Sequence, residues 1–307
     1  MEDTSFSYDP AAKLALCGDF VGIATFAQSF AILYLPEYRI IKNFELPNGF
    51  DCSDVCTDEE RFFFIAGGHY LMKIDTETME MESLETDNNQ EAFEGNIEGC
   101  FCNEEYVGVF TDNSVFLLTH ETLEIHRHYY DITFDTITCV KIDTYLMVGS
   151  GDGTIALIDI SKRQLDSDDV PIATTIACGY PVEDINILDS DGLFGVLTGC
   201  RKCLFFNFYD GNLIEKVDSF KHDMSIIAGI VYIDDVMRVI LADTEGRMIM
   251  WTEDEVIPFP EVEEEFYIRS YIVYDSFLLL GDDKGRVHKW CLESLTLVDT
   301  TEPLINK

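Results

Sequence analysis

The sequence predicts an all-β protein, and three observations carry that prediction. Runs of five to eight residues rich in Val, Ile, Phe, Tyr and Thr follow one another along the chain, separated by Gly, Asp and Asn. No stretch has apolar residues at the 3.6-residue period of a helix over three turns. The runs also recur in groups of four at a similar spacing, which indicates one repeated β-unit.

The middle of the chain holds the clearest unit. Ile137–Ile142 is predicted to be its first strand, and Tyr145–Ser150 its second. Asp152 and Gly153 follow as a tight turn, in which glycine supplies the positive φ that other residues adopt at a cost. Thr154–Ile160 is the predicted third strand, and a more polar fourth strand completes the unit.

The same unit returns along nearly the whole chain. One marker in each third strand gives spacings of 39, 44, 40, 48, 45 and 39 residues, with a mean near 42. The markers are Ile32, Leu71, Val115, Ile155, Cys203, Met248 and Val287. A period of about 40–45 residues with four short strands is typical of a β-propeller blade, and a propeller is one closed ring. We therefore expect a single domain over residues 1–307 with seven blades, at 10–47, 52–85, 97–130, 137–177, 182–220, 225–260 and 266–304.

A family resemblance follows from one motif and the two tryptophans. Gly149–Asp159 is similar to the second strand, turn and third strand of a WD40 repeat, with Ile158 in place of the family's Trp. Trp251 and Trp290 lie where that family places its Trp, but Thr and Cys follow them instead of Asp. The chain thus resembles a seven-bladed WD40 propeller with degenerate repeats. The degeneracy leaves six or eight blades as alternatives.

The polar tetrad of the WD40 family is not recognisable in these repeats. Its turn Asp corresponds to Asp152, Glu245 or Lys284, and Asp152 lies in the blade that lacks Trp. Gly68-His69 falls in a turn, so no repeat keeps the family's Gly-His pair. We therefore expect the blades to be stabilised by apolar packing in place of that network. We also expect some pairing between the N- and C-terminal segments, with Thr4–Asp9 as a candidate edge.

The charge of the chain excludes several classes of function. The 307 residues include 58 acidic and 20 basic side chains, for a formal net charge of −38. A hydrophobic fraction of 47% is enough for a packed core and argues against global disorder. The negative charge argues against binding to nucleic acid or to an anionic membrane. Three features favour a cytoplasmic or nuclear location. The acidic start has no signal-peptide pattern, no apolar run is long enough to span a membrane, and the ten cysteines are dispersed.

Several constellations resemble metal sites, and each has a simpler structural interpretation. Cys200-Arg201-Lys202-Cys203 has the spacing of half a zinc site, but no second pair has this spacing. Cys52, Cys56, Cys100 and Cys102 are interpreted as strand residues, where Cys acts as a small hydrophobe. The segment 126–128, His-Arg-His, is interpreted as the solvated edge of an outer strand. The sequence therefore predicts no metal.

The sequence also favours a non-enzyme without a cofactor. It has no glycine-rich phosphate loop and no Gly-x-Ser-x-Gly nucleophile elbow. Asp234-Asp235 and Asp282-Asp283 are acidic pairs, but pairs of this kind arise by composition in so acidic a chain. Asp282-Asp283 also lies at a predicted turn, where Asp is common.

The distribution of acidic residues is the best functional signal. Between Lys73 and Arg127 lie 53 residues without Lys or Arg, and fourteen of them are Asp or Glu. Acidic clusters at 85–95 and 261–265 fall between predicted blades, so we expect them on one face, and a third cluster lies at 166–169. These clusters either keep the protein soluble or steer a basic partner. The predicted partner-binding residues are Glu85, Asp87, Glu91, Glu94, Glu261, Glu263, Glu264 and Glu265.

The function predicted from these observations is a non-catalytic scaffold subunit of a multiprotein complex. Its acidic face would bind other protein subunits with basic segments, such as histone-like or Arg/Lys-rich peptides. The alternative is an architectural coat or nuclear-pore-type scaffold subunit, and a propeller enzyme is a remote third possibility. Direct nucleic-acid binding and membrane insertion are not expected.

Overall fold

A computed structural model describes most of the chain. The described residues are 11–25, 29–47, 50, 52–83, 93, 95–120, 122–133, 135–143, 145–162, 172–187, 193–199, 203–207, 213–217, 226–233, 236–242, 247–252, 255–260 and 267–304. Within these ranges the regular structure consists of 28 β-strands in seven sheets of four strands, without a helix. The all-β class and the four-stranded antiparallel unit predicted from the sequence are confirmed.

The sheets are called blades 1 to 7 in chain order, and each uses four consecutive strands. Blade 1 contains β1 (Ala11–Cys17), β2 (Phe20–Thr25), β3 (Ser29–Tyr34) and β4 (Arg39–Glu45). Blade 2 contains β5 (Cys52–Thr57), β6 (Phe62–Gly67), β7 (Tyr70–Asp75) and β8 (Glu80–Ser83). Blade 3 contains β9 (Gly99–Cys102), β10 (Tyr106–Phe110), β11 (Ser114–Thr119) and β12 (Ile125–Tyr130). Blade 4 contains β13 (Ile137–Ile142), β14 (Leu146–Ser150), β15 (Thr154–Ile158) and β16 (Ile172–Ala177).

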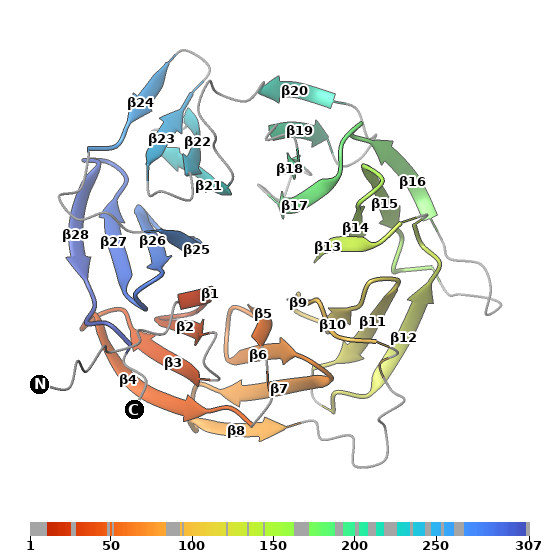
Figure 1. The fold of residues 1–307 in the computed structure, drawn as a ribbon, viewed down its shortest axis with the longest axis horizontal. Helices are drawn as coiled ribbons and strands as arrows, with labels where there is room; N and C mark the ends of the chain where they lie inside the picture. Colours follow the sequence, from red (N-terminus) through yellow and green to blue (C-terminus); the bar gives the residue numbers. More distant parts are fainter. Residues whose placement is uncertain are drawn as a thin grey trace, which may run out of the picture.

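The remaining three blades follow the same order. Blade 5 contains β17 (Val182–Ile187), β18 (Leu193–Thr198), β19 (Cys203–Asn207) and β20 (Leu213–Val217). Blade 6 contains β21 (Ile226–Ile233), β22 (Val236–Ala242), β23 (Met248–Trp251) and β24 (Val256–Pro258). Blade 7 contains β25 (Ile268–Tyr274), β26 (Phe277–Asp282), β27 (Val287–Cys291) and β28 (Thr296–Thr300). Figure 1 shows the sheets around a common centre, with the first strand of each blade innermost and the fourth outermost.

The turn predicted at Asp152-Gly153 has the expected conformation. Gly153 has a φ of 85°, in the left-handed region that glycine enters at no steric cost. The Asp152 carboxylate accepts a hydrogen bond from the Thr154 backbone N–H at 2.9 Å, which fixes the start of β15. Side chains would also be excluded at Gly153, since a Cβ there would lie 2.7 Å from the Tyr180 carbonyl oxygen.

The hydrophobic core lies between successive blades. One cluster joins blade 1 to blade 2 through Phe30 and Phe63, whose ring centroids are 5.5 Å apart. Another joins blade 2 to blade 3 through Phe64, Cys100 and Val107, all fully or almost fully buried. The strands β6, β7 and β14 are buried over most of their length because neighbouring blades cover both faces of their sheets.

The ring closes at a seam between blades 1 and 7. One core cluster combines Leu14, Val21 and Leu33 of blade 1 with Leu279 and Val287 of blade 7. The Tyr38 hydroxyl of blade 1 also donates to the Val287 carbonyl oxygen at 2.9 Å. Among the described residues, no strand of one terminus pairs within the sheet of the other, so the closure is made by packing between sheets. The candidate edge Thr4–Asp9 lies outside the described residues.

Blade 7 departs from the expectation of apolar packing alone. Asp282 is fully buried at the end of β26, and its carboxylate accepts from Arg286 Nε at 2.7 Å. The His288 ring lies on β27 with 3% exposure, and its Nε2 is 2.9 Å from the same carboxylate. Burial raises the pKa of Asp282, but hydrogen bonds from His288 and Arg286 outweigh it and leave the pKa below its usual value. This buried polar network joins β26 to β27 within blade 7.

Candidate functional site

The two faces of the ring differ in which chain segments reach them. In an antiparallel blade, the turns after the first and third strands lie on one face, which we call the hairpin face. The turn after the second strand and the ends that lead to the next blade lie on the other, the connection face. At the connection face of blades 2 and 3, Ile97 N–H donates to the Gly68 carbonyl oxygen at 2.7 Å, just before β9 begins. The candidate site lies on the hairpin face of the same two blades.

Acidic residues gather on this hairpin face and on the adjoining outer strand β8. They come from the β5–β6, β7–β8, β9–β10 and β11–β12 turns, and all of them are exposed. We call them the blade 2–3 acidic surface: Glu59, Glu60, Glu77, Glu80, Glu82, Glu104, Glu105 and Glu124. Arg61 is engaged within it, since its guanidinium pairs with Asp75 and lies 3.2 Å from Glu77. The surface is therefore predominantly negative.

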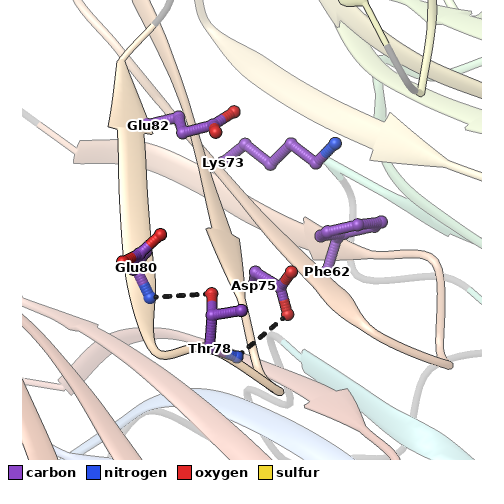
Figure 2. A pocket seen from close by; sticks show the side chains of 6 residues that line it. All are labelled: Phe62, Lys73, Asp75, Thr78, Glu80 and Glu82. Atoms are coloured by element: carbon purple, nitrogen blue, oxygen red, sulfur yellow. Dashed lines mark hydrogen bonds between the residues drawn. The ribbon is translucent and has the colours of Figure 1, made fainter.

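A pocket of about 260 Å³ opens on the side of blade 2, next to this surface. Figure 2 shows Glu80 and Glu82 on one side of it and Phe62 on the other, with Lys73 and Asp75 between them. The Lys73 ammonium lies 3.8 Å from the centroid of the Phe62 ring, a cation–π contact. It also donates to the carbonyl oxygen of His120 in blade 3 at 3.0 Å, so the lysine of this pocket ties the two blades together.

A cysteine and a histidine meet at the junction of blades 2 and 3. Cys102 ends β9 and His120 follows β11, and His120 Nε2 lies 3.1 Å from Cys102 Sγ. The His120 ring packs against Phe64 of blade 2 with a centroid distance of 5.5 Å. Both residues are partly exposed, whereas Cys100 two positions earlier is buried. The pair is thus a reachable thiol beside an imidazole.

The electrostatics of this pair favour a thiolate and an imidazolium. A hydrogen bond from the Cys56 thiol, then the hydrogen bond and charge of His120, lower the pKa of Cys102 to about 7 against the opposing effect of burial. Burial lowers the pKa of His120, but its interactions with Cys102 outweigh this and raise it. By contrast, burial raises the pKa of Cys17 to about 11 and that of Cys139 to about 12. Among the described cysteines, only Cys102 is partly exposed, contacts a histidine and has a pKa lowered to about 7.

The inner strands of the ring carry a second polar group. Lys13 Nζ on β1 lies 3.4 Å from Asp54 Oδ1 on β5, and the charge of Asp54 raises the pKa of Lys13. The Tyr271 hydroxyl on β25 donates to Asp184 Oδ2 on β17 at 3.2 Å. Burial lowers the pKa of Lys141, but Asp184 and Asp54 outweigh this and raise it. The charges of these groups are balanced between neighbouring blades. We therefore interpret them as a structural network.

Within the described ranges, no group of three or more His, Cys, Asp or Glu residues is arranged to hold a metal ion. No helix there is long and apolar enough to cross a membrane. The predicted partner-binding residues Glu85, Asp87, Glu91, Glu94, Glu261, Glu263, Glu264 and Glu265 all lie outside the described residues. The acidic segment 166–169, Cys200 and the Asp234-Asp235 pair also lie outside them.

Other residues singled out from the sequence can be placed. His126 and His128 lie on the outer strand β12, where His126 is exposed and His128 stacks on Phe116 at a centroid distance of 4.2 Å. Asp282 belongs to the buried network of blade 7 and Asp283 to the turn that follows. Cys52, Cys56, Cys100 and Cys102 are strand residues, as predicted.

The sequence reasoning missed the pairing of Cys102 with His120 and the acidic hairpin face. The sequence did contain a pattern that points to the position of Cys102. Cys17, Cys56 and Cys102 occupy the last or second-last position of the first strand in three consecutive blades, at spacings of 39 and 46 residues. Aligned positions in successive blades lie at the same level of the ring, so recurrent cysteines there predict neighbouring thiols.

Comparison with known proteins adds no identification. No family model matches the chain, and no curated protein matches it. The arrangement of small antiparallel sheets defines the chain as a β-propeller-like protein.

Proposed function

We propose that this protein is a non-catalytic interaction scaffold in a multiprotein complex, a degenerate WD40-like propeller that binds Lys/Arg-rich segments of other subunits. The observation that carries the proposal is the blade 2–3 acidic surface. Its carboxylates extend from rigid hairpins, and the cations within it, Arg61 and Lys73, are already engaged by Asp75, Glu77 and the His120 carbonyl. Uncompensated negative charge on a fixed framework favours encounter with a basic partner.

The pocket of blade 2 supports a more specific mode of binding. It is lined by Asp75, Glu80, Glu82 and Phe62, but the Phe62 ring is already covered by Lys73 and Asp75 is already paired with Arg61. Glu80 and Glu82 are the carboxylates that would meet the charged end of a lysine or arginine side chain of a partner. A volume of about 260 Å³ accommodates one such side chain, so the pocket would anchor an otherwise electrostatically held segment.

The test compares two variants of identical net charge. In the first, Glu80, Glu82, Glu104 and Glu105 of the acidic surface become Gln. In the matched control, the exposed residues Glu45, Glu255, Glu293 and Glu302 of other blades become Gln. Each variant and the wild type serve as bait in affinity purification from the native cell at low and moderate salt.

We expect the first variant to lose basic partners that the control retains, with association slowed on the order of tenfold. Salt should weaken wild-type capture, because screening at physiological ionic strength acts over about 8 Å. A third variant, with Glu261, Glu263, Glu264 and Glu265 changed to Gln, tests the predicted acidic connection separately. Partners recovered equally by all baits at both salt concentrations would contradict the proposal and favour an architectural role.

A further inference from the structure

The partly exposed Cys102 faces an imidazole that other contacts hold in place. Three contacts hold His120: Lys73 Nζ donates to its backbone carbonyl oxygen at 3.0 Å, Phe64 packs on its ring, and the Tyr106 backbone interacts with the ring and raises its pKa. These contacts direct Nε2 to Cys102 Sγ at 3.1 Å. An imidazole fixed by other contacts and aimed at a thiol is the arrangement that activates a cysteine.

A second thiol lies beside the first at the junction of the two blades. Cys56 lies on β5 of blade 2, which contacts β9 of blade 3, and Cys56 and Cys102 pack against the same core cluster. Burial raises the pKa of Cys56, so this thiol stays protonated while Cys102 ionises. Cys102 is therefore the thiol that is oxidised first, and Cys56 is the neighbouring thiol that closes the disulfide, giving up its proton as its sulfur attacks.

We propose that Cys102 is a modification site at which a small neutral hydroperoxide oxidises the thiolate, and that Cys56 then closes a disulfide between blades 2 and 3. In the first step, Cys102 sulfur attacks the peroxide, an S–O bond forms and the O–O bond breaks. The departing hydroxide takes a proton from His120 and leaves as water. In the second step, Cys56 sulfur attacks the sulfenic acid, an S–S bond forms and water leaves with the Cys56 proton. Hydrogen peroxide is reduced by two electrons and two thiols are oxidised.

The surrounding charges select the kind of oxidant. Glu104 and Glu105 follow Cys102 by two and three residues, and both are exposed. Their charge disfavours approach of an anionic oxidant such as glutathione disulfide but has no such effect on neutral hydrogen peroxide. The titratable and charged groups that face Cys102 from the elements around it are Cys17, Cys56, Asp58, Lys73, Cys100 and His120. Asp58 opposes the thiolate, and His120 and Cys56 outweigh it.

The first experiment measures alkylation of the full chain by iodoacetamide against pH, with each cysteine quantified by mass spectrometry. We expect Cys102 to reach half its maximal rate near pH 7, whereas Cys17 and Cys139 require a much higher pH. His120→Gln keeps a hydrogen-bonding side chain but cannot carry a charge, so it should move the Cys102 profile towards pH 9. A Cys102 profile in the wild type like that of an ordinary thiol would overturn the proposal.

The second experiment adds hydrogen peroxide and maps the products. Wild-type protein should form a Cys56–Cys102 disulfide that dithiothreitol reverses, and Cys102→Ser should form none. Cys56→Ser should stop at a Cys102 sulfenic acid that dimedone traps. Cys100→Ser is the matched control and should leave the disulfide yield unchanged. A Cys100–Cys102 disulfide, or a sulfenic acid that persists in the wild type, would overturn the assignment of Cys56. Absence of any oxidation at Cys102 would overturn the site itself.

Discussion

Blade 7 and the junction of blades 2 and 3 each place a histidine against an acidic group, at almost equal distances. His288 Nε2 lies 2.9 Å from Asp282, and His120 Nε2 lies 3.1 Å from Cys102. Their surroundings differ, because Asp282 and His288 are 0% and 3% exposed, whereas Cys102 and His120 are reached by solvent. A sealed pair cannot exchange partners and contributes to stability. A reachable pair of similar geometry is available for chemistry.

The largest expected effect of this difference is on Asp282. Replacing Asp282 with Ala leaves Arg286 and His288 in a buried site without their anionic partner. Breaking one side of a buried ion pair costs about 3–5 kcal/mol, so the unfolding free energy should fall by that amount. Urea denaturation measures it, with Asp283→Ala in the adjacent turn as the control. A loss below about 1 kcal/mol for Asp282→Ala would show that the sealed network is dispensable.

The two histidines give the next comparison. His288→Asn removes the hydrogen bond between Nε2 and the buried Asp282 carboxylate, and a bond of this kind is worth about 1.5–3 kcal/mol. His120→Asn acts on a partly exposed ring and should change the unfolding free energy by less than about 1 kcal/mol. Both values come from urea titrations at pH 7. Equal losses for the two variants would remove the distinction between a stabilising pair and a reactive pair.

The next comparison concerns stability at alkaline pH. Burial raises the pKa of Cys17 to about 11, so its contribution is fully present below the pKa of the unfolded thiol and is lost as pH rises towards 11. The slope is about 1.4 kcal/mol per pH unit for this one thiol. Cys102 has the opposite sign, because its lowered pKa adds stability between pH 7 and 9. Thermal unfolding from pH 7 to 11 measures both, and Cys17→Ala should flatten the alkaline decline. A Cys17→Ala curve parallel to the wild type would contradict the assignment.

The sequence was sufficient to predict the strands because each blade is local. The turn at Asp152-Gly153 and the short apolar runs on either side are read from neighbouring residues alone. The Cys102–His120 pair depends on β9 and on the end of β11, and its links to Cys56 and Lys73 depend on how blade 3 packs against blade 2. The Asp282 network was missed for a different reason. Its acceptor looked like an ordinary turn Asp, and only burial distinguishes it from Asp283.

The seam between blades 1 and 7 has a consequence for the nascent chain. Every described sheet is made of four consecutive strands, so each can pair its strands as soon as the ribosome releases them. The seam surface of blade 1, with Leu14, Val21 and Leu33, acquires its permanent cover only when Leu279 and Val287 have been synthesised. Vectorial synthesis therefore leaves one apolar surface open from the first blade to the last. We therefore expect the packing of blade 7 on blade 1, which joins residues far apart in the sequence, to form late in folding.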